Sequence, residues 1–514
     1  MSHWIILPVV LPAMLAPFII LAARYQIGIQ RVLSVAGVIA LLAITAGLTW
    51  QASDGTVTLY QLGDWAAPYG IVVVADRLST MMVLLTSALA LFVLLYAIGS
   101  GWDTRGRHFH ALYQFQLMGI MGAFLTGDLF NLFVFFEVLL IASYGLMIHA
   151  GGNPRLQAGV QYVLFNLLGS TLFLFALGAI YAETGTLNMA DLAQRVQLID
   201  TGASVGIRIA AVLLLLVFAI KAALVPLHFW LPSSYAEAPA PVAALFAIMT
   251  KVGAYAIIRV YTLIFPPDLA VTEGLHGLWL LPAALVSLAI GAVGVLAAKK
   301  LDRLVTFAII GSMGMVMVAI ALFTPTGIAA ALYYILHSTL AGAALFLIVD
   351  LVRSSRVHLE LKAMPPVAGS ALTAGLFFVA AIAMTGLPPL SGFLGKLLIL
   401  DASFDTLLGV WTWAIILSAS LISVVGFSRA GSTVFWKAKS VELPEGETRP
   451  APPSALSYAA VGGLVAMLIL LTVFAGQVHN YTTAMADQLF APGEYMTTVL
   501  ETPGKLSKLS EGDH

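Results

Sequence analysis

The chain has 514 residues, of which 60% are hydrophobic and 10% are charged, and its mean hydropathy is +0.98. A typical soluble domain carries charge on roughly 25% of its residues, so this composition excludes a soluble protein and makes lipid the solvent. The net charge of −1 argues against a nucleic-acid partner, and a chain without cysteine has no disulfide, no cysteine-ligated iron–sulfur cluster and no thiol chemistry.

Hydrophobic runs of about 20 residues, the length that a helix needs to cross the hydrocarbon, recur along the chain. We count fourteen, at residues 4–23, 31–50, 77–99, 110–126, 129–149, 158–182, 208–231, 239–264, 276–298, 303–323, 326–350, 371–402, 409–436 and 455–475. The run at 371–402 is too long for one straight crossing. The first run is not a signal peptide, because no basic residue precedes it and Arg24 and Arg31 follow it.

Lysine and arginine residues are more frequent in every second loop between these fourteen spans than in the loops on the other side. With the N-terminus outside, the inside loops hold 15 of the 24, the outside segments and nearby span ends hold 6, and Lys221, Lys251 and Lys396 lie within spans. This bias predicts that both termini face outwards. Between the spans, 51–76 form an outside loop, 183–207 contain a short surface helix and 443–454 form a Pro-rich linker, and a polar tail follows Ala475.

Three lysines lie inside apolar spans, although a charge near mid-membrane costs about 2.5–3.5 kcal/mol on insertion scales. Lys221 is 13 residues past Arg208 and 11 before Pro232, or roughly 16–20 Å from either end at 1.5 Å per residue. A lysine side chain cannot snorkel that far. Lys251 is similarly deep. Lys396 is five residues from Asp401, so snorkelling stays an alternative for it.

Other ionisable side chains lie in the spans. Glu137, the carboxylate nearest the centre of any span, either forms a static ion pair or tunes the proton affinity of a lysine, with Lys221 as the first candidate. His337 is either a hydrogen-bonded packing residue or a proton relay, and the buried lysines favour the relay. His228, nearer the inner end, is a residue of the channel mouth or a simple surface residue.

Two prolines interrupt helices beside these lysines. Pro226 removes a backbone hydrogen bond from the seventh span, and "TGLPPLSG" (385–392), which contains Pro388, does so in the twelfth. Unwound backbone at membrane depth is tolerated only where protein or a water-filled cavity satisfies it. The seventh and twelfth spans are five apart and therefore cross the membrane in opposite directions. The pattern predicts an inverted repeat, in which spans 4–8 correspond to spans 9–13, and a series of polar side chains that leads through the protein.

The stretch "PLHFWLPSSYAEAPAPVAALFAIMTKVGAYAIIR" (226–259) resembles the antiporter-like membrane subunits shared by respiratory complex I and the multi-subunit Mrp cation/proton antiporters. The similarity covers most of the chain, including the Glu-Ala-Pro at Glu237 and "GLPPLSGFLGK". It implies an all-α polytopic membrane fold of about fourteen helices, with two inverted five-helix repeats and broken seventh and twelfth helices. It also implies roles for five residues: Glu137 and Lys221 as a coupled pair, Lys251 and His337 as a central relay, and Lys396 as the terminal lysine.

Within the family, the segments at 63–86 and 127–147 are most similar to the D-type subunits of Mrp antiporters. This similarity implies a transporter subunit, not an enzyme, that needs no cofactor or metal. Together with other subunits of a complex in a bacterial plasma membrane, it would exchange Na⁺ or K⁺ for protons. A proton-pumping N-type subunit of complex I, which also has a lysine where Lys396 stands, or a membrane-bound hydrogenase subunit remains an alternative. So does a scaffold whose buried charges are inert.

The resemblance and the span count together predict five regions. They are an N-terminal three-helix segment at 1–107, a first antiporter repeat at 108–265, a second, inverted repeat at 266–436, a linker and last span at 437–475, and the C-terminal tail at 476–514.

Overall fold

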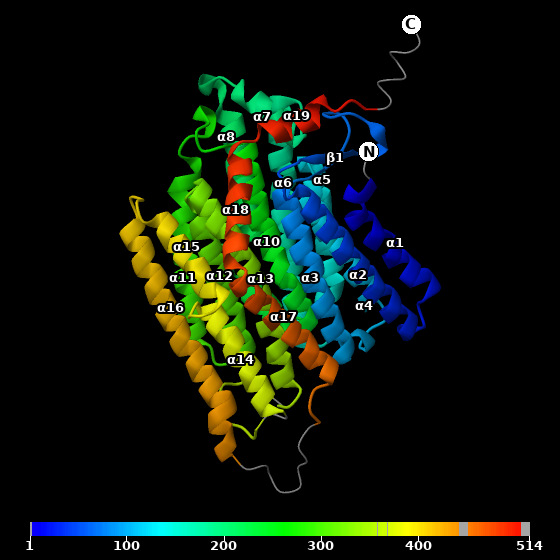
Figure 1. Cartoon of the computed structure of the whole chain (residues 1–514), viewed down its shortest axis with the longest axis vertical. Coiled ribbons are helices and arrows are strands. Elements are labelled where there is room, and N and C mark those ends of the chain that lie inside the picture. Colours follow the sequence, from blue (N-terminus) through cyan, green and yellow to red (C-terminus); the bar gives the residue numbers. More distant parts are fainter. Residues whose placement is uncertain (1–2, 357, 367–368, 442–450, 505–514) are drawn as a thin grey trace.

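The computed structural model describes residues 3–356, 358–366, 369–441 and 451–504. Long helices stand side by side in one bundle, with a small two-stranded sheet near one end (Figure 1). Apolar runs of this length form helices because, in lipid, a helix satisfies its backbone hydrogen bonds within its own segment.

The bundle begins with helices that correspond to the first eight predicted spans. They are α1 (Leu7–Ala22), α2 (Ile27–Ala52), α3 (Arg77–Gly99), α4 (Phe109–Leu125), α5 (Leu129–Met147), α6 (Asn153–Thr184), α8 (Val205–Lys221) with α9 (Trp230–Glu237), and α10 (Ala240–Leu263). Those of the remaining spans are α11 (Leu275–Ala297), α12 (Leu301–Ala321), α13 (Pro325–Arg353), α14 (Ser370–Thr385) with α15 (Ser391–Ser403), α16 (Gly409–Gly431) and α17 (Ala455–Val473).

All fourteen apolar runs are therefore helical. Within the described ranges, ten helices are long and apolar enough to cross a membrane, and α1 and α14 are shorter apolar helices. The number of crossings stays a prediction, because length and composition alone do not place the remaining helices in a membrane.

The two predicted helix breaks are confirmed. In the seventh run α8 ends at Lys221 and α9 begins at Trp230, with Pro226 between them. In the twelfth run α14 ends at Thr385 and α15 begins at Ser391, with Pro388 in the connection. Each break leaves backbone outside the helical hydrogen-bond pattern, close in the sequence to a buried lysine.

The loops at the end of the bundle that carries the sheet are ordered. The loop at 51–76 forms the antiparallel strands β1 (Thr58–Gln61) and β2 (Val72–Ala75). The segment at 183–207 contains the predicted short helix, α7 (Met189–Gln197), which Asn188 caps. Its apolar side chains, Met189, Leu192 and Val196, are buried, so α7 packs onto the bundle.

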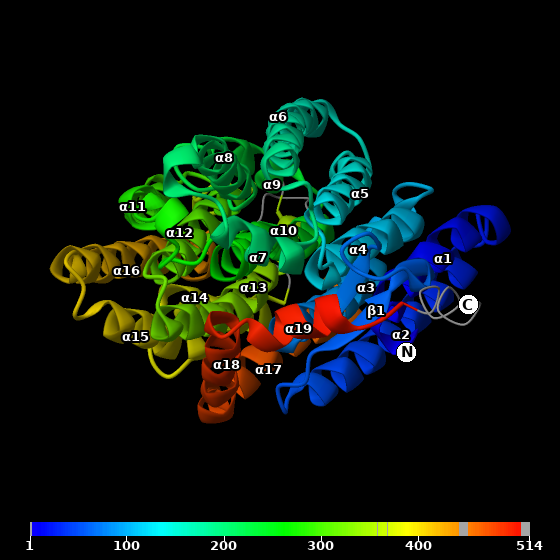
Figure 2. The same cartoon turned by 90° about the horizontal axis from the view of Figure 1, so that it is seen from above.

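The chain after Ala475 is more structured than the polar tail that we expected. It forms α18 (Ala475–Phe490) and α19 (Gly493–Glu501). α18 packs against α13, and α19 lies across the sheet end of the bundle against α7 and β1 (Figure 2). Met485, Leu489 and Val499 are buried there. The part of the expected tail from 505 to 514, and the linker residues 443–450, lie outside the described residues.

Buried ion pairs join distant segments at the two ends of the bundle. At one end Arg259 of α10 lies 2.7 Å from Asp76, the N-cap of α3. At the other, Asp103 accepts hydrogen bonds from Arg31 at 2.6 and 3.0 Å and lies 3.2 Å from Nε2 of His110. Burial raises the pKa of Asp103, but the hydrogen bonds with His110 and Arg31 outweigh it and hold that pKa below its usual value. Asp103 therefore fixes α2 and α4 as a carboxylate.

Candidate functional site

The five charged residues predicted from the sequence lie on a continuous row of packed helices. Glu137 is on α5, Lys221 ends α8, Lys251 is on α10, His337 is on α13 and Lys396 is on α15. With α6 between α5 and α8, each helix of this row packs against the next (Figure 2). Lys251 and His337 are fully buried, and the other two lysines are at most 9% exposed. We call these five residues the polar row.

Glu137 and Lys221 are joined through α6. The Ser170 hydroxyl donates to Glu137 Oε1, and Lys221 Nζ donates to Asn166 Oδ1 at 3.0 Å. Asn166 and Ser170 are four residues apart and so lie on one face of α6. The ion pairs of the described residues do not include a direct one between Glu137 and Lys221, although the charge of Glu137 acts on the lysine. The Asn166 amide donates to the Tyr162 carbonyl and not to Ser170, so Glu137 and Lys221 are held by two separate hydrogen bonds on one face of α6, which we call the α6 bridge.

The sequence-based reasoning missed both bridging residues. The available signal was the spacing of two polar side chains, Asn166 and Ser170, within the otherwise apolar "FNLLGS" of α6. A further contact comes from Phe136, whose ring centroid lies 5.9 Å from Lys221 Nζ. An aromatic face at this distance attracts an ammonium group.

Lys251 occupies the centre of the row. Its Nζ is fully buried and makes no hydrogen bond to the described residues. Its helix packs closely against α8 at Gly253, where a Cβ would lie 2.8 Å from Ala222 N and from Phe218 O. An unpaired ammonium group is costly in an apolar interior. The site therefore suits a lysine that is neutral, or one that water reaches, during part of a cycle.

His337 connects α10 to the second break. Its Nδ1 lies 2.9 Å from the Ser391 hydroxyl, at the start of α15, and its Nε2 has no partner among the described residues. Gly392 lets α15 approach, since a Cβ there would lie 2.8 Å from that Nε2. Lys396 and Lys251 are the charged groups that act on His337. One imidazole nitrogen is therefore bonded to Ser391, and the Ala383 carbonyl of α14 also acts on the ring.

Lys396 points into the bundle. Its Nζ donates to the Thr385 carbonyl at 2.6 Å and to the Ser420 hydroxyl at 2.8 Å, so it satisfies a carbonyl at the end of α14. A cavity of about 20 Å³, lined by Lys396, Ser420, Ser312 and others, adjoins it, and that volume suffices for about one water molecule. This geometry favours a buried Lys396 over a snorkelling one.

The secondary residues are less closely connected. His228 lies in the first break and is 6% exposed, so it is not a simple surface residue, and its ring is tilted against that of Phe229 with centroids 4.5 Å apart. Glu237 ends α9, where its backbone carbonyl accepts a hydrogen bond from Arg155. In the described part of the chain, no hydrogen bond or ion pair links the side chain of His228 or Glu237 to the polar row.

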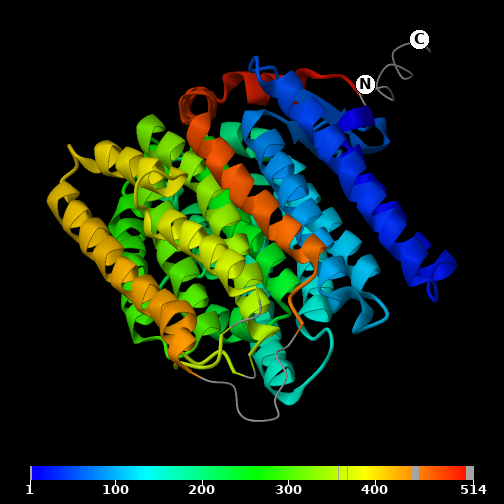
Figure 3. The ribbon, with the colours of Figure 1, turned by 60° about the horizontal axis from the view of Figure 1, so that its bottom comes forward.

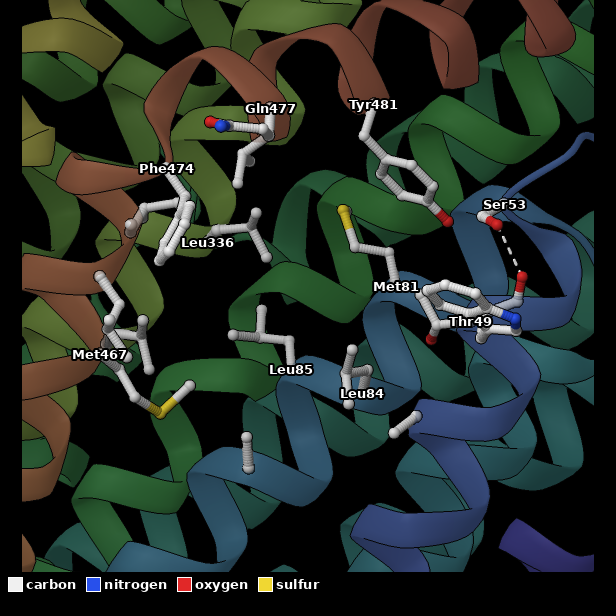
Figure 4. Close-up of a pocket in the computed structure, with 17 residues that line it drawn as sticks. Thr49, Ser53, Met81, Leu84, Leu85, Leu336, Met467, Phe474, Gln477 and Tyr481 are labelled. Carbon is white, nitrogen blue, oxygen red and sulfur yellow. Dashed lines mark hydrogen bonds between the residues drawn. The ribbon is translucent and has the colours of Figure 1, made fainter.

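A separate cleft of about 570 Å³ lies between α2, α3, α13, α17 and α18 (Figure 4). Its lining is mostly aliphatic, with Met81 and Met467 among the side chains, and Gln477 and Tyr481 of α18 lie at one end. Leu336 lines this cleft, but the next residue, His337, does not. Since none of the polar row opens into it, the cleft is not the site of the charged groups.

Comparison with known proteins shows the family to which this chain belongs. A family model described as NADH:quinone oxidoreductase/Mrp antiporter, transmembrane, matches residues 126–423, which contain the whole polar row. The chain belongs to this family. The NADH:quinone oxidoreductase/Mrp antiporter family thus accounts for the helices from α5 to most of α16, while α1 to α4 and α17 to α19 lie outside the matched range.

Two relatives that match this chain over nearly its full length are named as antiporter subunits of the D type. The chain is 37% identical to the Na(+)/H(+) antiporter subunit of this type from Bacillus subtilis, over 98% of this chain and 100% of the relative. It is 36% identical to the corresponding protein of Rhizobium meliloti, which is named as a probable K(+)/H(+) antiporter subunit, over 98% of each.

Two solved structures share the fold at 27% sequence identity. A chain of the Mrp complex from Dietzia sp. DQ12-45-1b has a TM-score of 0.86 and covers 97% of this chain and 100% of its own length. A chain of respiratory complex I from Thermus thermophilus has a TM-score of 0.78 and covers 95% and 99%.

Proposed function

We propose that the chain is a membrane subunit of a multi-subunit antiporter that exchanges Na⁺ or K⁺ for protons. The observation that carries the proposal is the polar row, in which three lysines and a histidine are buried inside apolar helices and Glu137 is half-buried beside them. Ionisable residues at this depth typically belong to ion or proton pathways. The full-length similarity to proteins named as D-type antiporter subunits favours exchange over redox-driven pumping.

Proton transfer along the row uses groups that can both accept and release a proton. Ser170 and Asn166 hold Glu137 and Lys221 on one face of α6 by two separate hydrogen bonds, so the two charges lie near each other and a change in the charge of the glutamate alters the proton affinity of the lysine. Lys251 and His337 then form the central steps, and Lys396 the last. Movement at the two helix breaks changes which of these groups approach one another, because backbone there is not held in a helical ladder.

The subunit works as a transporter component and not as an enzyme. Its relatives are named as subunits, and the Dietzia neighbour belongs to a complex. We therefore infer that other membrane subunits complete the exchange path and that both a monovalent cation and protons cross the assembly.

Leaving out this one subunit tests the proposal. Everted vesicles from a bacterial host without its own antiporters are prepared with the complete set of subunit genes, or with the set lacking this chain. A pH-sensitive dye should report cation-driven proton movement in the first and little or none in the second. Adding this chain from a second plasmid should restore it. Equal exchange in both vesicles would refute the function.

We also propose that the protein lies in the bacterial plasma membrane with both termini outside, as the lysine and arginine bias predicts. Reporter tags after Arg107 and after Lys439 should then be cytoplasmic, whereas a tag at His514, which lies outside the described residues, should be periplasmic. The measurement is labelling by a membrane-impermeant reagent in intact cells. A cytoplasmic tag at His514 together with an outside N-terminus would require an odd number of crossings and contradict fourteen.

A further inference from the structure

Three arginines converge on a pocket at the end of the bundle opposite to α7 and α19. The pocket has a volume of about 520 Å³ and lies where α3 ends, α13 ends and α17 begins. Figure 3 shows α17 running between α14 and α3 from this end. Arg105, Arg155 and Arg353 line it and come from three separate segments of the chain. The polar row makes no contribution to the lining.

The Asp350 carboxylate lines this pocket and already accepts hydrogen bonds from neighbouring side chains. Asp350 Oδ2 accepts hydrogen bonds from Trp102 Nε1 at 2.8 Å and from the Tyr96 hydroxyl at 3.0 Å, and all three residues are buried. These bonds hold the carboxylate against the wall of the pocket. Its charge offsets one of the three guanidinium groups at most.

Two of the three arginines, Arg105 and Arg155, are held in position without a neutralising carboxylate. Among the described residues, Arg105 and Arg155 have no ion-pair partner, and Arg353 lies 3.3 Å from Asp302. Arg105 stacks at 3.9 Å over the Trp102 ring, and Arg155 lies 5.5 Å from the same ring. Arg155 also donates to three backbone carbonyls, which fix its orientation. The pocket therefore presents preorganised positive charge with spare N–H donors.

We propose that this pocket binds the phosphate of an anionic phospholipid headgroup at the membrane surface. Guanidinium groups pair with phosphate oxygens through two parallel hydrogen bonds, and several of them together select an anion. The N-terminus of the 19-residue helix α17, capped by Ser454, adds a positive dipole end.

The position of the pocket favours a lipid as the source of the phosphate. The pocket lies at the ends of long apolar helices, where headgroups meet water. Basic pockets between transmembrane helices on the cytoplasmic side recognise such headgroups, and the orientation proposed above places this end inside. Leu456, in the first turn of α17 and 38% exposed, provides apolar surface beside the pocket for an acyl chain.

The matched pair Arg105→Gln and Arg107→Gln tests the inference. Both arginines are exposed on the same loop, but only Arg105 lines the pocket. Its side chain stacks over Trp102 at the surface and makes no hydrogen bond to the described residues, so we expect both variants to fold. The complete complex is purified in detergent and incubated with phosphatidylglycerol or phosphatidylcholine. Native mass spectrometry then measures how much of each lipid stays bound. We expect wild type and Arg107→Gln to retain phosphatidylglycerol preferentially. Arg105→Gln should bind it on the order of tenfold more weakly, as loss of one charge-assisted hydrogen bond predicts.

The remaining arm distinguishes lipid from free phosphate. Inorganic phosphate that displaced phosphatidylglycerol at similar concentrations would support the phosphate site and identify a soluble anion as its source. Equal retention of the two lipids, or equal weakening by the two substitutions, would overturn the proposal. So would loss of another subunit from Arg105→Gln with lipid binding unchanged, because the arginines would then contact protein. The outcome is independent of exchange activity, so it separates this proposal from the antiporter function.

Discussion

Replacing Lys221 with alanine should lower cation/proton exchange by roughly a hundredfold or more, the scale expected when a group that accepts and donates a proton is removed. Lys221 Nζ donates to Asn166 on the face of α6 where Ser170 holds Glu137, and alanine offers no group that takes up a proton in place of the lysine. The complex should still assemble, because the helix break and the packing surfaces of α8 and α10 remain. Exchange in everted vesicles, normalised to copurified subunits, is the measurement.

The control for this prediction is Lys362→Ala, which removes an exposed lysine that pairs with Glu360 outside the polar row and should leave exchange unchanged. A double-mutant cycle then tests the bridge. Glu137→Ala alone should also impair exchange severely, and the double variant should be no worse than either single one, because both act on the same step. Multiplicative losses would show that Glu137 and Lys221 act separately. Near-normal exchange by Lys221→Ala at good expression would remove this lysine from the pathway.

Replacing Lys396 with arginine should abolish most exchange even where assembly is normal. A guanidinium group stays protonated at any accessible pH, so it cannot release the proton that a relay passes on. Glutamate titrates, so Lys396→Glu should be no worse than Lys396→Arg and should show a shifted pH optimum. The measurement is exchange rate against pH for both variants in one membrane background.

Steric fit has to be separated from proton release at this site. A Cβ on Gly386 would lie 2.6 Å from Lys396 Cδ, so the stem of the lysine is tightly enclosed and arginine introduces extra bulk. Lys396→Met keeps nearly the length of the side chain and removes the amine without adding volume, and it should be as inactive as arginine. Wild-type rates for Lys396→Met across the pH range would show that Lys396 carries no proton.

Much of this protein could be predicted from local features of the sequence. Its composition alone requires a membrane protein, and the fourteen apolar runs locate the helices, because in lipid a long apolar segment has no alternative to a helix. Pro226 and Pro388 locate the two breaks for an equally local reason, the missing N–H. The five charges of the polar row stand out because burying them in lipid is costly, so each needs a reason to be there.

The partners of those charges were decided only by the tertiary structure. Whether Lys221 meets Glu137 directly or through Asn166 and Ser170 depends on the rotation of α6 between α5 and α8, and the packing of distant segments sets that rotation. The direction of Lys396, towards Thr385 and away from the membrane surface, likewise depends on how the two halves of the broken helix fold against each other.

Two further features depended on packing in the same way. Helices α18 and α19 are too short and polar to form a membrane signal, and they are stabilised by the faces that they bury against α13, α7 and β1. The arginine pocket combines residues 105, 155 and 353, which show no common pattern along the chain. Hydrophobic length is a property of a continuous segment and can be read locally, whereas a hydrogen bond or a pocket requires several helices to be placed relative to one another.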